Sequence, residues 1–141
     1  MSLLRLAPSI IKTIGIISTV LIIDQLFKYK IRLYGGFYTC NSGIAFNIKL
    51  PFLFYWLLFG IASLIIILIY STTLNKVSKL LLIGLFLVLG GALSNIVDRY
   101  FFGCVIDYIS LVNILPTFNI ADIAIFLGCF LIFIYSLKSQ E

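Results

Sequence analysis

Four long apolar stretches constrain the fold of this chain more than any other feature of its sequence. They cover residues 10–27, 51–70, 80–97 and 119–137. The hydrocarbon core of a bilayer is about 30 Å thick, so a helix needs about 20 apolar residues to cross it. A mean hydropathy of +1.20 and a charged fraction of 11% exclude an ordinary soluble domain. We therefore predict an all-α polytopic membrane protein with four transmembrane helices, in a single domain over residues 1–141.

The first apolar stretch could alternatively be a cleaved signal peptide. Its apolar run is long, however, and no site of small residues follows it. A lipoprotein-type cleavage site at Cys40 would be preceded by small residues, whereas the bulky Phe37 and Tyr38 stand there. We expect this stretch to remain as a permanent helix.

The basic residues do not decide the orientation of the four helices. If both termini lie in the cytoplasm, half of the lysines and arginines fall inside and half outside. The inside set is Arg5, Lys12, Lys76, Lys79 and Lys138, and the outside set is Lys28, Lys30, Arg32, Lys49 and Arg99. Equal counts give the positive-inside rule no preference. The net charge of +5 indicates anionic lipid headgroups as partners rather than nucleic acid, because the sequence has no basic stripe.

Residues 34–50, between the first two apolar stretches, have a different pattern. Apolar side chains alternate with other side chains over residues 44–50, which is typical of a strand. Two turn signals precede this segment, Gly35-Gly36 and Asn41-Ser42-Gly43. We expect a small amphipathic β-sheet on the membrane surface, with its aromatic side chains at headgroup depth. A stiff interfacial loop is the alternative.

Four carboxylates, Asp24, Asp98, Asp107 and Asp122, lie in or beside the apolar stretches. A carboxylate is costly in hydrocarbon, so an intramembrane acid is a functional-site hypothesis by default. The sequence has no histidine, which excludes Ser-His and Cys-His catalysis and the histidine-based zinc sites. The economical route to hydrolysis that remains is a pair of carboxylates that activates water.

The surroundings of Asp107 and Asp122 favour different protonation states. Asp107 lies in the apolar segment Val105–Ile109, which favours the neutral acid by desolvation. Asp122 follows Asn119 by three residues, which predicts Asn119 as the N-cap of the last helix and Asp122 in its first turn. The helix dipole there favours an ionised carboxylate. Two such groups can act as acid and base around one water, although a capping role alone would also explain Asp122.

Two further clusters have both functional and structural interpretations. Asp24 and Lys28 are four residues apart and share a helix face, which suits either a site or an interfacial ion pair. Asn95 lies one helical turn from both Asp98 and Arg99, so the three side chains could be hydrogen-bonded together. This group could belong to a site, connect helices structurally, or mark the membrane boundary.

The three cysteines show no metal-ligand spacing. Cys129 lies within an apolar stretch, where a cysteine behaves as a small hydrophobic residue. Cys40 and Cys104 would lie on the same side of the membrane, and the sequence does not favour a disulfide between them but leaves it open. We expect no metal and no cofactor.

The polar residues form five blocks that match one family in order. The blocks are Asp24-Gln25-x-x-Lys28, Asn41-x-Gly43-x-Ala45-Phe46, Gly90-Gly91-Ala92-x-x-Asn95-x-x-Asp98-Arg99, Val105-x-Asp107-Tyr108 and Phe118-Asn119-x-Ala121-Asp122. With them the chain resembles lipoprotein signal peptidase (signal peptidase II), a family of aspartyl peptidases of the bacterial inner membrane. One block alone would be weak evidence, whereas all five in order on four apolar stretches are specific.

The resemblance implies an endopeptidase that removes the signal peptide from diacylglyceryl-modified prolipoproteins and cleaves before the lipidated cysteine. It places the catalytic aspartates at Asp107 and Asp122. Substrate-binding or site-organising roles fall on Asp24, Lys28, Asn41, Gly43, Asn95, Asp98, Arg99, Asn119 and Ala121. It further implies a multi-pass protein of the cytoplasmic (inner) membrane, with both termini cytoplasmic and the active site near the outer leaflet. The expected partners are prolipoprotein and membrane lipids, with no nucleic acid, and the expected state is a monomer.

The sequence departs from the family pattern at three positions. Ser94 stands where glycine is usual, Ile44 where a smaller residue is common, and Tyr108 where phenylalanine is frequent. None of these residues is an acid, so they concern loop shape and substrate fit more than chemistry. Two other classes remain open, a small transporter or channel that uses intramembrane acids and a structural helix bundle. The sequence has no internal repeat of the kind that transporters show.

Overall fold

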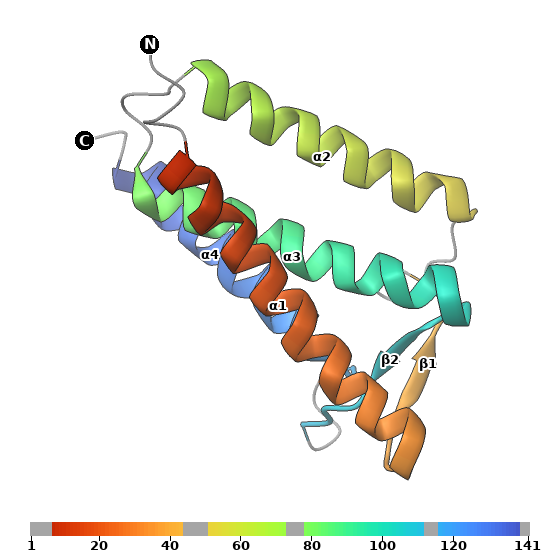
Figure 1. Ribbon diagram of the computed structural model, residues 1–141. Coiled ribbons are helices and arrows are strands. Elements are labelled where there is room, and N and C mark those ends of the chain that lie inside the picture. Colours follow the sequence, from red (N-terminus) through yellow and green to blue (C-terminus); the bar gives the residue numbers. More distant parts are fainter. Residues whose placement is uncertain (1–6, 44–50, 73–77, 112–115, 139–141) are drawn as a thin grey trace.

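The computed structural model describes residues 7–43, 51–72, 78–111 and 116–138, and within them it is mostly helical (Figure 1). The helices are α1 (Ala7–Tyr34), α2 (Phe52–Thr72), α3 (Lys79–Phe102) and α4 (Ile120–Lys138), and the strands are β1 (Thr39–Asn41) and β2 (Val105–Asp107). Each apolar stretch thus becomes a helix, and each of these helices extends slightly past at least one predicted end. The predicted helical class, with a small sheet, is confirmed.

Two of the described helices, α3 and α4, are long and apolar enough to cross a membrane, each with a mean hydropathy of 2.4. Within α2, the described apolar run Leu53–Ile65 is shorter than a full crossing. The second half of α1 carries several charged side chains, among them Asp24 and Lys28. The count of four membrane spans therefore stays a prediction.

Helix α3 is the centre of the bundle. It packs most extensively against α4, then against α1, and least against α2. Small residues permit the close contacts, as expected for helices that pack in lipid. A Cβ atom on Gly84 would lie 2.8 Å from the carbonyl oxygen of Gly128, and one on Gly91 would collide with the carbonyl oxygen of Ala121. The Gly91–Ala121 contact brings the first turn of α4 against the polar half of α3.

The ends of α3 and α4 place the polar segments at one end of the bundle. Helix α3 stops at Gly103, whose φ of 75° is readily adopted only by glycine and whose N–H donates to the carbonyl of Arg99 at 3.1 Å. The chain then turns directly into β2. At the start of α4, the N–H of Asp122 donates to Asn119 Oδ1 at 2.9 Å, which confirms the predicted N-cap.

The strands that pair in the sheet differ from those that the sequence predicts. Strand β1 lies in the expected segment, but its antiparallel partner is β2, which follows α3, and Cys40 pairs in register with Ile106. The alternating residues 44–50, including Ile44, lie outside the described part of the chain. A local pattern cannot reveal a partner that lies more than 60 residues away in sequence. The structure also joins Cys40 and Cys104 in a disulfide, which the sequence does not favour.

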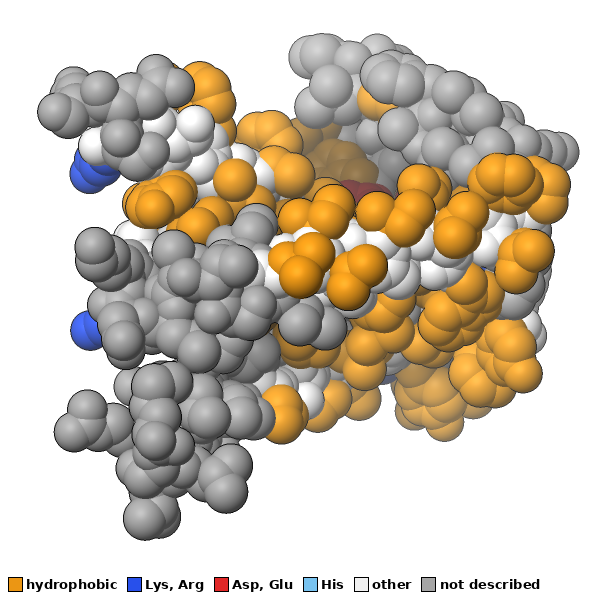
Figure 2. All heavy atoms as spheres, turned by 90° about the horizontal axis from the view of Figure 1, so that it is seen from above, with side chains coloured by type: hydrophobic (Ala, Val, Ile, Leu, Met, Phe, Trp, Pro, Cys, Tyr) orange, Lys and Arg blue, Asp and Glu red, His pale blue; other side chains and the backbone are white. Residues whose placement is uncertain are grey.

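The described surface is strongly apolar. Large hydrophobic side chains are exposed on all four helices, for example Ile22 on α1, Leu57 on α2, Ile83 on α3 and Phe126 on α4. Figure 2 shows such side chains over much of one face, with acidic atoms visible only at depth inside a hollow. Helices that expose apolar side chains on their outer faces are suited to a surrounding of lipid.

Candidate active site

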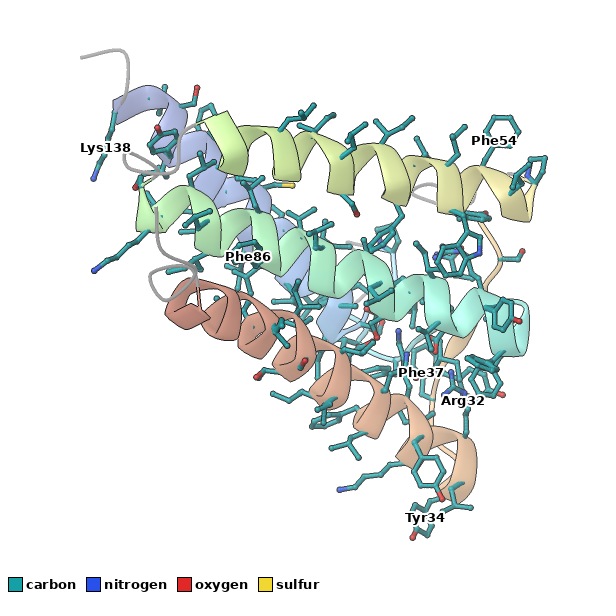
Figure 3. All side chains as sticks on the ribbon, turned by 45° about the horizontal axis from the view of Figure 1, so that its top comes forward. Arg32, Tyr34, Phe37, Phe54, Phe86 and Lys138 are labelled. Atoms are coloured by element: carbon teal, nitrogen blue, oxygen red, sulfur yellow. A yellow bond between two sulfur atoms is a disulfide. The ribbon has the colours of Figure 1, made fainter. Side chains whose placement is uncertain are left out.

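The predicted site residues converge where α1, α3, α4 and the sheet meet. Seven polar or charged side chains there are buried, namely Asp24, Lys28, Ser94, Asn95, Asp98, Asp107 and Asn119. Arg32 lies near this end of the bundle in Figure 3, whereas Lys138 lies at the opposite end. Buried polar groups at this density require mutual hydrogen bonds, so the partners of each side chain are informative.

A cluster of paired charges forms one half of the site. The Lys28 Nζ atom lies 2.6 Å from Asp24 Oδ2 and 2.9 Å from Asp98 Oδ2, and all three side chains are fully buried. Asp98 also accepts from Arg32 at 2.7 Å. Asp24 accepts from the Ser94 hydroxyl at 2.7 Å and from the backbone N–H of α4 at Ala121 at 3.1 Å. These two carboxylates are engaged by cations and donors on both oxygens, which suits a role in organising the site.

Asp107 and Asp122 form the other half of the site and have a different environment. Asp107 accepts from the side-chain amides of Asn119 at 2.6 Å and Asn41 at 3.0 Å. Asp122 accepts from the Asn95 amide at 2.8 Å and from the backbone N–H of Asn119 at 3.1 Å. Among the described residues neither carboxylate makes a salt bridge, in contrast to Asp24 and Asp98. Their partners are neutral donors, which orient a carboxylate without supplying a permanent counter-charge.

The pKa of Asp107 is raised from its ordinary value to about 6. Burial is the largest cause, and the negative charge of Asp122 adds to it. The hydrogen bonds from Asn41 and Asn119 oppose the rise because they stabilise the ionised form. A carboxyl group with such a pKa can hold or release a proton near neutral pH.

Two asparagines connect the halves of the site. Asn95 Oδ1 accepts from Lys28 Nζ at 3.0 Å and from Asn119 Nδ2 at 3.2 Å, while its amide group donates to Asp122. Asn119 in turn bonds both Asp107 and Asp122. The charged cluster, the two amides and the two carboxylates therefore form one continuous network.

The prediction that the side chains of Asn95, Asp98 and Arg99 bond to one another is wrong, because each has other partners in the structure. Asp98 turns towards Lys28 and Arg32 on α1, while Arg99 turns the other way, because adjacent residues on a helix do not face each other. Arg99 donates to the carbonyl oxygens of Asn95, at 3.2 Å, and of Gly43, and its guanidinium lies 4.7 Å from the centre of the Tyr55 ring. Its role in the structure is to connect α3 with the turn after β1 and with α2.

The sequence alone assigned no role to three residues that contact this network, Gln25, Arg32 and Tyr55. Arg32 pairs with Asp98, and Gln25 donates to Asp98 and to both the carbonyl and the hydroxyl of Ser94. Tyr55 is buried, and its hydroxyl donates to the Ser42 carbonyl at 3.2 Å. The spacing of Asp24, Lys28 and Arg32 at four-residue intervals on one helix face was the available signal for Arg32.

A cavity of about 700 Å³ borders the two carboxylates. Its polar lining includes Asn41, Asn95, Arg99, Asp107 and Asp122. Most of the remaining lining is apolar and comes largely from α2, α3 and α4, with Leu58, Phe59, Val88, Leu89 and Ile125 among its members. The cavity thus has at its polar end two carboxylates of the kind that can activate water, and it has room for an extended apolar chain along its walls.

Fold and site together define an integral membrane protein that holds two uncompensated carboxylates at the end of an apolar cavity. The chain belongs to the signal peptidase II family, because the family described as "Signal peptidase (SPase) II" matches residues 16–138. This membership makes the protein a protease of the membrane.

Individual relatives and a solved structure agree with the family match. The lipoprotein signal peptidase of Moorella thermoacetica is 39% identical over 77% of this chain and 81% of its own length. That of Blochmanniella pennsylvanica is also 39% identical, over 65% of this chain and 60% of its own length, which is less than two thirds. A bacterial membrane enzyme solved by the in meso method at 2.3 Å resolution superposes with a TM-score of 0.79, at 27% identity, over 92% of this chain and 90% of its own.

Proposed function

We propose that the protein is an aspartic-type endopeptidase that removes the signal peptide from diacylglyceryl-modified prolipoproteins and cleaves before the lipidated cysteine. The observation that carries this proposal is the pair Asp107 and Asp122, which border one cavity, share the donor Asn119 and have no cationic partner among the described residues. The relatives are lipoprotein signal peptidases, which supports the substrate class. The peptidase is one domain over residues 1–141, acts as a monomer and has no nucleic acid partner.

The two aspartates share one proton across a bound water. The ionised carboxylate takes a proton from the water, whose oxygen attacks the scissile carbonyl carbon, while the protonated partner donates to the carbonyl oxygen. When the gem-diol intermediate collapses, the C–N bond breaks, the proton taken from water passes to the leaving amine, and one hydroxyl returns its proton to the partner carboxylate as the C=O bond forms again. The pair titrates as a unit, and the pKa of Asp107 of about 6 suits this shared state.

The remaining site residues position the pair and the substrate. Asn95 and Asn119 orient the carboxylates by direct hydrogen bonds. Asn41 orients Asp107 from the sheet, and Arg99 holds the carbonyl of Gly43 beside the cavity. The buried charges Asp24, Lys28 and Asp98 fix α1 against α3. Gly91 lets the backbone of α4 approach α3 at Ala121, whose N–H donates to Asp24.

The shape of the cavity suits a lipoprotein precursor. Its apolar walls would hold the hydrophobic stretch of the signal peptide, and its polar end would hold the peptide bond. The acyl chains of the substrate would remain in the surrounding lipid, beside the exposed apolar faces of the helices. Membrane lipids are therefore part of the binding environment as well as the solvent.

The protein has four spans in the bacterial cytoplasmic membrane, with both termini cytoplasmic and the site near the outer leaflet. Lys28 and Arg32 are held in ion pairs and Arg99 bonds backbone carbonyls, so these three are poor topology signals. Only Lys30 and Lys49 of the five outside charges then remain, against five inside. The disulfide at the site end supports the same orientation, since disulfides persist in oxidising compartments.

Reconstitution into proteoliposomes tests the proposal against the two other classes. The purified protein should cleave a lipidated precursor and leave the unlipidated precursor intact. Ion flux without cleavage would identify a transporter, and the absence of both activities would leave a structural bundle. Mass spectrometry of the product should place the new N-terminus at the lipidated cysteine, and a different cleavage position would contradict the assigned specificity.

A further inference from the structure

Five consecutive residues, Thr39–Gly43, include Asn41 at the polar end of the cavity, and we refer to these five residues as the strap. The strap is attached to several elements at once. Thr39 bonds the hydroxyl of Thr117 and, at 3.5 Å, the backbone carbonyl of Asp107. The carbonyl oxygens of Ser42 and Gly43 accept from Tyr55 and Arg99. Asn41, in the middle, donates to the Asp107 carboxylate.

One of these attachments is covalent. Cys40 forms a disulfide with Cys104, with the two Cα atoms 5.4 Å apart and a separation of 64 positions in sequence. Cys104 lies between Gly103, which ends α3, and β2, which carries Asp107. The disulfide therefore joins the segment that bears Asn41 to the segment that bears Asp107.

Few non-covalent contacts hold the segment of Asn41 against the segment of Asp107. Strands β1 and β2 have three residues each, and an isolated two-stranded sheet is marginally stable at best. Cys40, Asn41 and most of the preceding turn are exposed or only partly buried, so little apolar burial holds the strap in place. The covalent bond is consequently the strongest constraint on the distance between Asn41 and Asp107.

We propose that the Cys40–Cys104 disulfide is a positioning element of the active site, which holds Asn41 against Asp107 so that full peptidase activity requires the oxidised protein. This inference rests on the proposed role of Asp107 in catalysis. Because a misplacement of about 1 Å can cost about 10²-fold in rate, we expect reduction to lower kcat by at least about tenfold. The effect on KM should be smaller, because most of the cavity wall comes from helices that the disulfide does not join.

The experiment compares oxidised and reduced protein in detergent, with a lipidated precursor as substrate. The cysteine of this substrate is alkylated and does not react with dithiothreitol. Dithiothreitol should lower the kcat of the wild-type protein, and re-oxidation of the same sample should restore it. The double variant Cys40→Ser/Cys104→Ser should start at the low value and be insensitive to the reductant. Cys129→Ser is the matched control, since Cys129 is free and exposed on α4, and it should respond as the wild type does.

A second readout separates positioning from a general loss of structure. Loss of the Asn41 hydrogen bond removes a contact that lowers the pKa of Asp107, so the alkaline limb of the pH–rate profile should move to higher pH in the reduced protein. The charged groups around Asp107 are Asp122 from α4, Lys28 from α1 and Arg99 from α3 across the cavity, and reduction changes none of them. A purely structural bond would lower the yield of folded protein without moving this limb.

The experiment distinguishes a failure of the positioning role of the disulfide from a failure of the proposed function. Normal kcat in the double serine variant, with Asp107→Asn inactive, would overturn the positioning role and leave the peptidase intact. Equal inhibition of the double variant by dithiothreitol would also overturn it, as would free thiols at both positions in the active protein. Activity in Asp107→Asn would instead remove the proposed mechanism. If the double variant does not fold, reversible reduction of the wild type decides the question.

Discussion

Asn119 and Asp122 cap the start of α4 reciprocally, because the backbone N–H of each donates to the side chain of the other, at 3.1 and 2.9 Å. This arrangement is a capping box with an asparagine and an aspartate. The second oxygen of the same Asp122 carboxylate accepts from Asn95 and borders the cavity. Capping and catalysis are therefore compatible roles for Asp122, since the cap fixes the orientation that the reaction would need.

The first prediction concerns the two carboxylates. Asp107→Asn and Asp122→Asn should each lower the cleavage rate by at least about 10³-fold, because an amide can neither accept nor hold the transferred proton. The measurement is cleavage of a lipidated precursor by purified protein in detergent. Both variants should still insert and fold, with a modest fall in melting temperature, because the amide keeps the shape of the carboxyl group but only one of its two accepting oxygens. Substantial cleavage by either variant would exclude the dyad.

Asn119 offers a test that separates the helix cap from the site. Serine is about as good an N-cap as asparagine, but it lacks the amide that donates to Asp107 at 2.6 Å. Asn119→Ser should therefore lower kcat by about ten- to a hundredfold, since a hydrogen bond to a charged group contributes about 1.5–3 kcal/mol. Its melting temperature should fall less than that of Asn119→Ala, which loses the cap as well. Equal melting temperatures for the two variants would show that the cap contributes little.

The buried charge cluster predicts a large effect on stability. Lys28→Met removes the cation that pairs with both Asp24 and Asp98, so the free energy of unfolding should fall by about 3–5 kcal/mol. Adding Asp24→Asn should recover part of this loss, because one uncompensated buried charge is then removed. The matched control is Lys30→Met, two residues further along α1, where the side chain is exposed. Similar unfolding curves for Lys28→Met and Lys30→Met would contradict the structural role of the cluster.

The pH dependence of the reaction has a defined sign. The proposed mechanism requires one proton on the pair, so kcat/KM should fall at low pH when both acids are protonated and at high pH when both are ionised. Burial and the charge of Asp122 raise the pKa of Asp107 to about 6. The pair titrates as a unit, and we assign its second ionisation, which sets the alkaline limb, mainly to Asp107.

Asn41→Ala removes a hydrogen bond that stabilises ionised Asp107, so this variant should move the alkaline limb to higher pH. The acid limb should move less. The measurement is the pH profile of kcat/KM for the lipidated precursor, with Cys129→Ser expected to reproduce the wild-type profile. An alkaline limb that moves to lower pH in Asn41→Ala would contradict the assignment of that limb to Asp107.

Much of the architecture and of the candidate site could be predicted from local patterns. Apolar length located the helices, and the position of Asn119 three residues before Asp122 predicted the cap of α4. A carboxylate is costly in an apolar stretch, so the embedded acids could be identified as candidate site residues. The structure brings two of them, Asp107 and Asp122, to one cavity. These features depend on residues that are close in sequence or on the cost of charge in an apolar setting.

The rest depends on contacts between distant segments. The pairing of Asp98 with Arg32 rather than with its neighbour Arg99 follows from which face of α3 meets α1. The pairing of β1 with β2, and the disulfide beside it, follow from where Gly103 redirects the chain. No local periodicity carries this information, because each feature is set by the packing of complete helices.

The hydrogen bonds of Asp24 also have a consequence for the order in which the protein matures. This carboxylate is bound by Lys28 within α1, by Ser94 of α3 and by the N–H of Ala121 at the start of α4. Asn119 and Asp122 belong to the cap and first turn of that same helix, so a nascent chain that ends before α4 holds neither the second acid nor the final donor to Asp24. Under the proposed mechanism, proteolytic competence therefore requires α4 to be in place, and copies that lack this helix should be inert towards lipoprotein precursors.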